Sequence, residues 1–221
     1  MMKPGLYNER KEFIMDYQEA IQNGINTKVG NPLENCTLVV PEDVTEIEDA
    51  YFAYFKLKEI VLPDSIKKID EYAFCDSKIE RIKIPEGITE LEVSTFRNCK
   101  NLKEIILPET LKKIGGRCFS NCKSLKEICL PDGLEEINIW AFSGSSIKEI
   151  KIPATVHLIQ ELAFSSCDSL EKIYMYKSTL EKNPAFEGFN HKRITIMSLD
   201  TLLKEKRSFK EINNFYKDIE R

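Results

Sequence analysis

The chain has 221 residues, of which 42% are hydrophobic and 31% are charged, a balance typical of a folded protein with a buried core. Its formal net charge of -4 gives it no basic excess, so we expect no nucleic-acid partner. No apolar run approaches the roughly 18 residues that a membrane-spanning helix needs, and we therefore expect no membrane insertion.

The first 35 residues precede the repeating part of the chain. Charges are scattered through residues 1–24, with no apolar segment of the kind found in a signal peptide, so we expect a cytoplasmic protein. Phe13, Ile14, Tyr17 and Ile21 follow helical spacing, and Gly24 comes where a C-cap is expected. Residues 1–35 are predicted to form a helical cap over the open end of the core, with partner docking as the alternative.

A short sequence motif recurs about seven times through residues 36–197, with a period of 22 or 23 residues. Each of the first six copies has a proline and, eleven residues later, a phenylalanine. The prolines are Pro41, Pro63, Pro85, Pro108, Pro131 and Pro153, and the phenylalanines are Phe52, Phe74, Phe96, Phe119, Phe142 and Phe164. The seventh copy is degenerate, with Tyr176 in the proline position and Phe186 in step, and residues 193–196 are predicted to form an eighth strand. Such an array is one elongated domain.

The apolar columns of the repeat predict which side chains are buried. Two columns before the proline alternate as in a β-strand, which the proline should end because it has no N–H for the ladder. They are Val40, Leu62, Ile84, Leu107, Leu130 and Ile152, and Leu38, Ile60, Ile82, Ile105, Ile128 and Ile150. These strands should stack as a parallel sheet.

Two further columns follow the proline and predict a second extended segment on the opposite side of the core. They are Val44, Ile66, Ile88, Leu111, Leu134 and Val156, and Ile47, Ile69, Leu91, Ile114, Ile137 and Ile159. A tight turn should join the two segments, and the chain should then turn helically at the phenylalanine. A single copy cannot bury its own apolar face, so each one depends on its neighbours for stability.

Residues 198–221 leave the repeat again. Residues 208–211 fit a capping box, and the apolar residues after it follow helical spacing. These are Phe209, Ile212, Phe215, Tyr216 and Ile219. We expect a C-terminal helix that caps the array, with a partner-binding or dimerising helix as the alternative. A monomer is favoured.

The phrase Leu-x-x-Ile-x-Leu-Pro, then Leu-x-x-Ile, then Ala/Cys-Phe-x-x-Cys resembles the BspA-like (treponemal) class of leucine-rich repeat, over about residues 36–197. The resemblance implies an α/β-type repeat solenoid, a leucine-rich-repeat superhelix that is β-dominated with short terminal helices. In that family the solenoids serve as recognition surfaces, on bacterial cell-surface proteins that adhere to hosts and on proteins of unknown role. The resemblance therefore implies binding.

The seven cysteines occupy columns that favour structural thiols. Cys99, Cys122 and Cys167 lie three residues after a phenylalanine, in a column that also holds Ser77 and Ser145. We expect this column to be buried and its thiols to be reduced, because a free thiol is among the most buried side chains. A disulfide between the stacked Cys99 and Cys122 is the alternative.

The sequence offers no site for chemistry. Cys118 and Cys122 have neither a second cysteine pair nor a nearby histidine to complete a zinc site, so we expect no metal. His157 lies in a column of solvent-facing residues, and His191 lies in the last, degenerate copy. Neither is paired by spacing with a nucleophile, and no glycine-rich phosphate loop occurs. We predict no catalytic residue, no cofactor and no enzymatic activity.

The outward side chains of the predicted strands are the remaining candidates for function. One outward column, on the face expected to be concave, comprises Val39, Val61, Lys83, Ile106, Cys129, Lys151, Tyr174 and Thr195, and the column beside it includes Glu104 and Glu127. The predicted partner-binding residues are Val61, Lys83, Ile106, Cys129, Lys151, Tyr174, Glu104 and Glu127. The alternative is a solvated face with no partner.

Two hypotheses about function remain open at this point. The first is a non-enzymatic intracellular scaffold that binds a protein through the concave sheet. The second is a secreted or cell-surface adhesin module whose signal or anchor is absent from this chain. Free cysteines would favour the first, whereas disulfides or glycan on the Asn35-Cys36-Thr37 sequon would favour the second.

Overall fold

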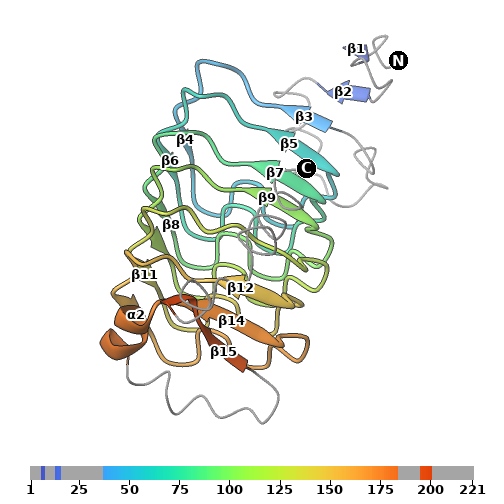
Figure 1. Ribbon diagram of the computed structural model, residues 1–221. Helices are drawn as coiled ribbons and strands as arrows, with labels where there is room; N and C mark the ends of the chain where they lie inside the picture. The colour runs from blue at the N-terminus through green and yellow to red at the C-terminus, as the bar shows by residue number, and fades with distance from the viewer. Residues whose placement is uncertain (1–5, 8–12, 16–36, 184–194, 201–221) are drawn as a thin grey trace.

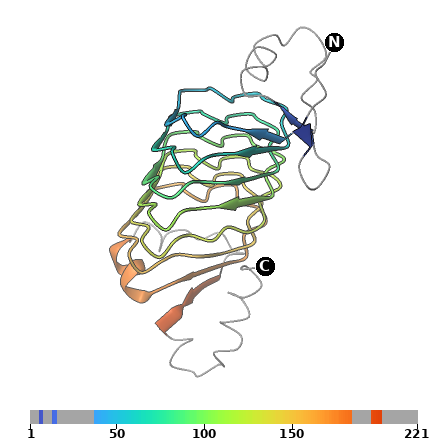
Figure 2. The same ribbon diagram turned by 90° about the horizontal axis from the view of Figure 1, so that it is seen from above.

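The computed structural model describes residues 6–7, 13–15, 37–183 and 195–200. The chain forms a parallel β-solenoid of about seven turns with very little helix. Each copy of the repeat makes one turn, called a rung below, and the rungs stack in chain order, as Figures 1 and 2 show from two directions. The predicted fold class is confirmed.

The strand that ends before the proline in most copies, and its equivalent in the last two copies, forms the first wall of the solenoid, called the sheet wall. Its strands follow one another along one side of the molecule (Figure 1). They are β3 (Thr37–Val39), β5 (Glu59–Val61), β7 (Arg81–Lys83), β9 (Glu104–Ile106), β12 (Glu149–Lys151), β14 (Lys172–Met175) and β15 (Thr195–Ser198). The pairing is parallel and places equivalent residues opposite one another, so that Leu38 faces Ile60 and Ile82 faces Ile105. The strand predicted around Ile128 is not formed, so the wall consists of two sheets, one ending at β9 and one beginning at β12.

The second wall lies on the opposite side of the core, as the columns after the proline predict. Its strands are β4 (Glu46–Ile47), β6 (Lys68–Ile69), β8 (Glu90–Leu91), β10 (Lys113–Ile114), β11 (Glu136–Ile137) and β13 (Leu158–Ile159). The turn that joins the two walls begins at the proline, whose carbonyl accepts a bond from the N–H three residues later, as in Ile66 N to Pro63 O at 3.2 Å.

The third wall, called the turn wall, holds the phenylalanines and differs from the prediction. The expected helical turn is wrong, because in each of the six rungs whose phenylalanine is described two residues have positive φ, one two positions before the phenylalanine and one two positions after it. Around Phe119 these are Arg117 (φ 58°) and Asn121 (φ 60°). A left-handed residue interrupts a helix, so its backbone groups must bond elsewhere. The N–H of Phe74 donates instead to the carbonyl of Thr95 on the next rung at 2.9 Å, and the equivalent bonds of four other phenylalanines measure 2.7–3.0 Å.

Phenylalanine rings form the centre of the core. The six residues of this column are fully buried and their rings stack at centroid distances of 5.0–5.6 Å, nearly parallel throughout. The apolar columns of both walls pack around them. The column directly before the proline is less uniform than predicted, since Ile84 and Ile152 are buried but Leu62, Leu107 and Leu130 are only partly buried.

The N-terminal end of the sheet wall corrects a second prediction. Phe13 and Ile14, which the spacing assigns to a helix, lie in strand β2 (Phe13–Met15). This strand pairs in parallel with β3, and β1 (Leu6–Tyr7) pairs antiparallel with β2. Tyr17, Ile21 and the remainder of the predicted helical cap lie outside the described residues.

A short helix, α2 (Lys177–Lys182), takes the place of a second-wall strand in the seventh copy. Asn183, which follows it, is buried and its side-chain oxygen accepts a bond from the N–H of Ile159 at 2.6 Å. Because Ile159 lies in β13, this contact satisfies a donor at the last edge of the second wall. Phe186 and the predicted C-terminal helix over residues 198–221, apart from 198–200, lie outside the described residues.

Among the helices within the described ranges, none has the length and apolar character that crossing a membrane would require.

Candidate functional site

The predicted partner-binding residues lie on the outer face of the sheet wall, called the sheet face below. Strand register places Val61 opposite Val39, Ile106 opposite Lys83, and Tyr174 opposite Lys151. The alternation of the strands fixes this arrangement, because Ile60 and Ile105 point into the core and their neighbours must point out. The structure therefore brings the predicted residues into one row that runs across the rungs.

Apolar side chains are exposed at one end of this row. The exposed fractions are 39% for Val39, 44% for Val61 and 51% for Ile106. Lys83, which lies between Val61 and Ile106, is also exposed, as is Cys129 on the rung that follows Ile106. Packing does not require an apolar residue at these positions, because the lysine in the same column shows that a charged one is accommodated. This end of the row therefore exposes apolar surface that the packing of the core does not explain.

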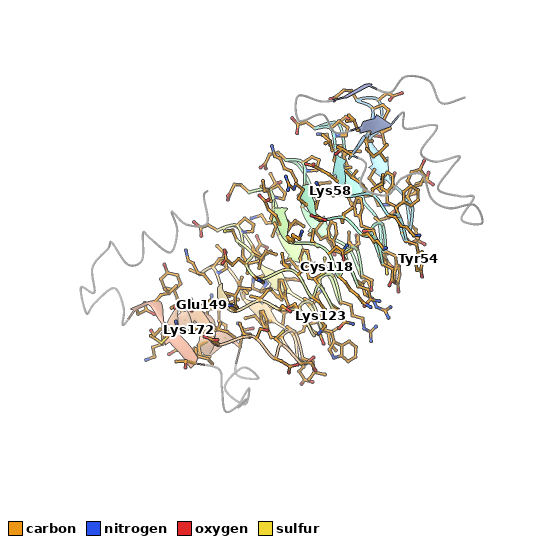
Figure 3. The ribbon with its side chains drawn as sticks, turned by 90° about the vertical axis from the view of Figure 1, so that its right-hand side faces the viewer. Tyr54, Lys58, Cys118, Lys123, Glu149 and Lys172 are labelled. Carbon is orange, nitrogen blue, oxygen red and sulfur yellow. The ribbon has the colours of Figure 1, made fainter. Side chains whose placement is uncertain are left out.

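The other end of the row is polar and internally connected. Glu149 accepts a hydrogen bond from Lys172 Nζ at 2.7 Å and another from the Tyr174 hydroxyl at 3.2 Å. Figure 3 shows Glu149 and Lys172 beside each other. Burial raises the pKa of Tyr174, and the Glu149 carboxylate raises it further. Lys151 Nζ lies 3.8 Å from Asp132 Oδ1. These contacts hold the polar side chains of β12 and β14 in place.

The two predicted acidic residues, Glu104 and Glu127, lie exposed beside the row. Neither forms an ion pair with another residue of the part of the chain that the structure describes. They therefore add negative charge to the margin of the sheet face next to Ile106.

One residue of the predicted row is in a different place. Thr195 was expected to follow Tyr174, but β15 pairs Thr195 with Lys172 and places Met197 opposite Tyr174. The last copy has no proline from which to count, so the sequence does not determine how this strand aligns with β14. The observed pairing differs from the expected one by two residues. The row ends with Tyr174 and Met197.

The cysteines occupy the positions expected of structural thiols. All six cysteines of the described residues are free thiols, and five of them are buried, Cys129 being exposed. Cys99, Cys122 and Cys167 each donate to the carbonyl of the phenylalanine one rung earlier, at 3.0–3.2 Å. Burial raises the pKa of Cys99 to about 12, so the neutral thiol is the form that the core holds.

The other residues considered as candidates for chemistry are the histidines and the metal-ligating side chains. His157 is exposed, as predicted, whereas His191 lies outside the described residues. Residues 37–183 and the other described segments contain no group of three or more His, Cys, Asp or Glu side chains placed to hold a metal ion.

A second set of exposed side chains, which the sequence analysis missed, lies on the turn wall. Several of the left-handed positions are exposed and carry large side chains: Tyr54 is 70% exposed, and Leu162 is 47% exposed. Figure 3 shows Tyr54 at the outer edge of the side chains drawn. The guanidinium of Arg117 lies 4.2 Å from the centre of the Trp140 ring on the next rung. Counting two residues from each phenylalanine would have found this column.

The comparison with protein families identifies the repeat. The model of the BspA type leucine-rich repeat region, with six copies, matches residues 31–122 and 94–215. The chain belongs to the BspA-type leucine-rich repeat family. Proteins built from leucine-rich repeats are generally non-enzymatic, and the family suggests a protein-interaction or adhesin-like module.

Solved structures of bacterial leucine-rich repeat proteins resemble this BspA-type chain. One from Bacteroides ovatus is 22% identical with a TM-score of 0.48, and the match covers 74% of this chain and 54% of that one. The T. pallidum Leucine Rich Repeat protein is 17% identical with a TM-score of 0.47, covering 88% and 78%.

A leucine rich cell surface protein from Faecalibacterium prausnitzii is 22% identical with a TM-score of 0.44, covering 73% of this chain and 59% of its own length. The chain thus spans little more than half of this protein and of the one from Bacteroides ovatus. No curated protein matches the chain.

Proposed function

We propose that this BspA-type chain is a non-enzymatic scaffold that binds a protein partner through its sheet face. The observation that carries the proposal is the exposure of Val39, Val61 and Ile106 on a sheet whose other outward positions accept charged residues. Exposed apolar residues that packing does not require, grouped on one face, mark a candidate interaction surface. A cytoplasmic location is part of the same proposal.

The shape of the site favours a partner with an apolar centre and a charged margin. Val61 and Ile106 supply the apolar contact, whereas Lys83 lies between them and Glu104 and Glu127 lie at the side. Charged residues around an apolar centre select among partners more than they strengthen binding. A complementary partner would present an apolar side chain to Ile106 and a basic residue to Glu104.

A comparison of two matched substitutions tests this function. Proteins captured from the native host by the wild-type chain are identified by mass spectrometry, and the candidate is then purified and its affinity measured. Ile106→Glu should weaken binding at least about tenfold, because it puts a charge in the apolar centre of the interface. Leu162→Glu changes an equally exposed residue on the turn wall and should bind as the wild type does.

The alternative outcomes separate the two surfaces. If Leu162→Glu loses the partner and Ile106→Glu keeps it, the turn wall is the binding surface and the sheet face is not. Equal affinity of both variants and the wild type also contradicts the proposal. Because both positions are exposed, neither substitution should change the melting temperature by more than a few degrees.

A further inference from the structure

Lysines gather along the edge where the turn wall leads into the sheet wall. They lie at two equivalent positions of successive rungs, and all are exposed; together they are called the lysine band. Its members are Lys78, Lys100 and Lys123, each four residues after a phenylalanine, and Lys103, Lys126 and Lys148, at the start of the sheet-wall segment. The chain as a whole has a net charge of -4, so this concentration of positive charge is local.

Backbone hydrogen bonds hold the band in register. The N–H of Lys148 donates to the carbonyl of Lys126 at 3.1 Å, and that of Lys103 donates to the carbonyl of Glu80 at 2.7 Å. On the turn wall, the Asn121 side chain donates to that of Asn98 at 3.0 Å. The lysines therefore stand on adjacent rungs of a rigid array rather than on a mobile loop.

The band is only slightly neutralised by the rest of the described chain. Lys103 pairs with Glu80 at 2.8 Å, and this hydrogen bond lowers the pKa of Glu80. The other five lysines form no ion pair with any described residue. Like charges on neighbouring strands destabilise a sheet. The apolar core does not explain why lysine recurs at these exposed positions.

The spacing of the rungs indicates the shape of a complementary anion. Phenylalanine rings on successive rungs are 5.0–5.6 Å apart, and the lysines four residues after each phenylalanine repeat once per rung. Side chains three or four residues apart on an α-helix are separated by about 5–6 Å, so acidic residues on one helical face match this interval. Alternate residues of an extended strand are about 6.6 Å apart, so acidic side chains on a strand would be displaced from the lysines by about 3 Å after two rungs.

The margins of the band argue against a broad polyanion. Glu104 and Glu127 directly follow Lys103 and Lys126, and they place a row of negative charge beside the lysines. Duplex nucleic acid carries charge on both strands, about one per 1.7 Å of its axis, and would meet these carboxylates. A helix with a single acidic stripe would not. We propose that the lysine band binds an acidic α-helix of a protein partner, whose carboxylates contact Lys78, Lys100 and Lys123 on three successive rungs.

This inference does not rest on the function of the sheet face, because the two surfaces can be tested separately. The probe is a fluorescein-labelled, alanine-rich peptide of about 20 residues, long enough to be helical, with glutamates spaced four, three and four residues apart in one stripe. Its isomer has the same composition with the glutamates distributed around the helix. Fluorescence anisotropy measures the affinity of the full chain for each peptide, at low and at physiological salt.

The striped peptide should bind at least about tenfold more tightly than its isomer or a labelled DNA duplex, because only the stripe engages three lysines at once. The triple variant Lys78→Gln/Lys100→Gln/Lys123→Gln should lose this advantage. A control triple variant, Lys67→Gln/Lys112→Gln/Lys182→Gln, removes the same charge from other surfaces and should bind the striped peptide normally. Ile106→Glu on the sheet face should do so as well.

Several outcomes would overturn the proposal. Equal affinity for the striped peptide and its isomer, or tighter binding of the DNA duplex, would show a surface that attracts any polyanion. Undiminished binding by the lysine-band variant would place the peptide elsewhere. Equal losses in the two triple variants would show that net charge alone is responsible. Melting curves of both triple variants, compared with that of the wild type, establish that the proteins measured are folded.

Discussion

Gly115 and Gly116 are neighbours in the chain, yet they should respond very differently to alanine. A Cβ atom on Gly115 would lie 2.6 Å from the carbonyl oxygen of Leu91 and 2.7 and 2.8 Å from the carbonyl carbon and oxygen of Glu92. All three are backbone atoms of the preceding rung. On Gly116 the nearest atoms would be Ile139 O at 3.4 Å and Ile139 Cγ2 at 3.6 Å, which are ordinary contacts.

The size of the effect follows from what has to move. Gly115 donates its N–H to the Leu91 carbonyl at 2.7 Å, so the two rungs cannot separate without loss of that bond. Overpacking of a tight interior costs about 1–3 kcal/mol. In a protein of this size 1 kcal/mol corresponds to about 2–4 °C, so Gly115→Ala should melt about 2–12 °C below the wild type.

Gly116→Ala provides the matched control. Neither glycine has a positive φ, so the backbone conformation allows alanine at both positions and only the available space differs. The substitution at Gly116 restricts the unfolded chain, which stabilises by about 0.4–1 kcal/mol where no clash opposes it. Thermal and urea unfolding followed by circular dichroism compares the two variants. A Gly115→Ala protein as stable as Gly116→Ala would refute the close approach of the rungs.

Three further predictions concern the core and its thiols. Phe119→Ala removes a fully buried ring that stacks on two others and should cost about 3–5 kcal/mol, so a melting curve like that of the wild type would mean that the ring column is not buried. The Cys99 thiol, whose pKa rises from 9.0 to about 12 on folding, contributes stability that is complete below pH 9 and is lost as pH rises towards 12. Cys99→Ser lies in a column that already accepts Ser77, and between pH 7 and pH 10 its free energy of unfolding should fall by about 1 kcal/mol less than that of the wild type. Urea titrations in which the two proteins lose the same free energy would contradict this reasoning. In a Cys36→Ser background, a maleimide should label only the exposed Cys129 of the native chain, and mass spectrometry finding label on Cys118 would show that the core opens.

The sequence predicted the walls of the solenoid because each rung repeats the same physical requirement. Ile60 and Ile82 must point inward on every strand, and the proline that follows ends each strand at the same place. The phenylalanine column and the buried Cys99 and Cys122 follow from the same count. The outward positions of the sheet face, among them Val61 and Ile106, were located by simple alternation.

The errors occurred where the repeat gives no such signal. Arg117 and Trp140 adopt left-handed φ values although neither is a glycine or an asparagine, so ordinary turn chemistry does not mark them. The strain at Arg117 is offset by a hydrogen bond between rungs, from its N–H to the Ile139 carbonyl at 3.0 Å, which a single copy cannot show. At the N-terminus, the three residues of β2 are too few for helical and strand periods to be told apart. The degenerate last copy left the register of Thr195 undetermined.

The candidate site could be predicted only as a set of positions. The sequence places Lys151 and Tyr174 in one column, but the bond from Tyr174 to Glu149 depends on side-chain conformations that alternation does not specify. The lysine band was likewise visible only in part. Lys103, Lys126 and Lys148 form a recognisable column, whereas their proximity to Lys100 and Lys123 depends on how the chain leaves the turn wall.

The backbone N–H groups of five phenylalanines on the turn wall donate to the next rung, and this gives the wall a direction. The N–H of Phe52 donates to the carbonyl of Ala73 one rung later, and that of Phe142 donates to the carbonyl of Ala163 in the same manner. Each of these rungs therefore offers carbonyl acceptors to the rung before it and N–H donors to the rung after it. A complete rung inserted or removed between two others would leave complementary groups in contact. Lengthening or shortening by whole copies is thus the change that this architecture tolerates best, and it would alter the reach of the binding surface without altering its chemistry.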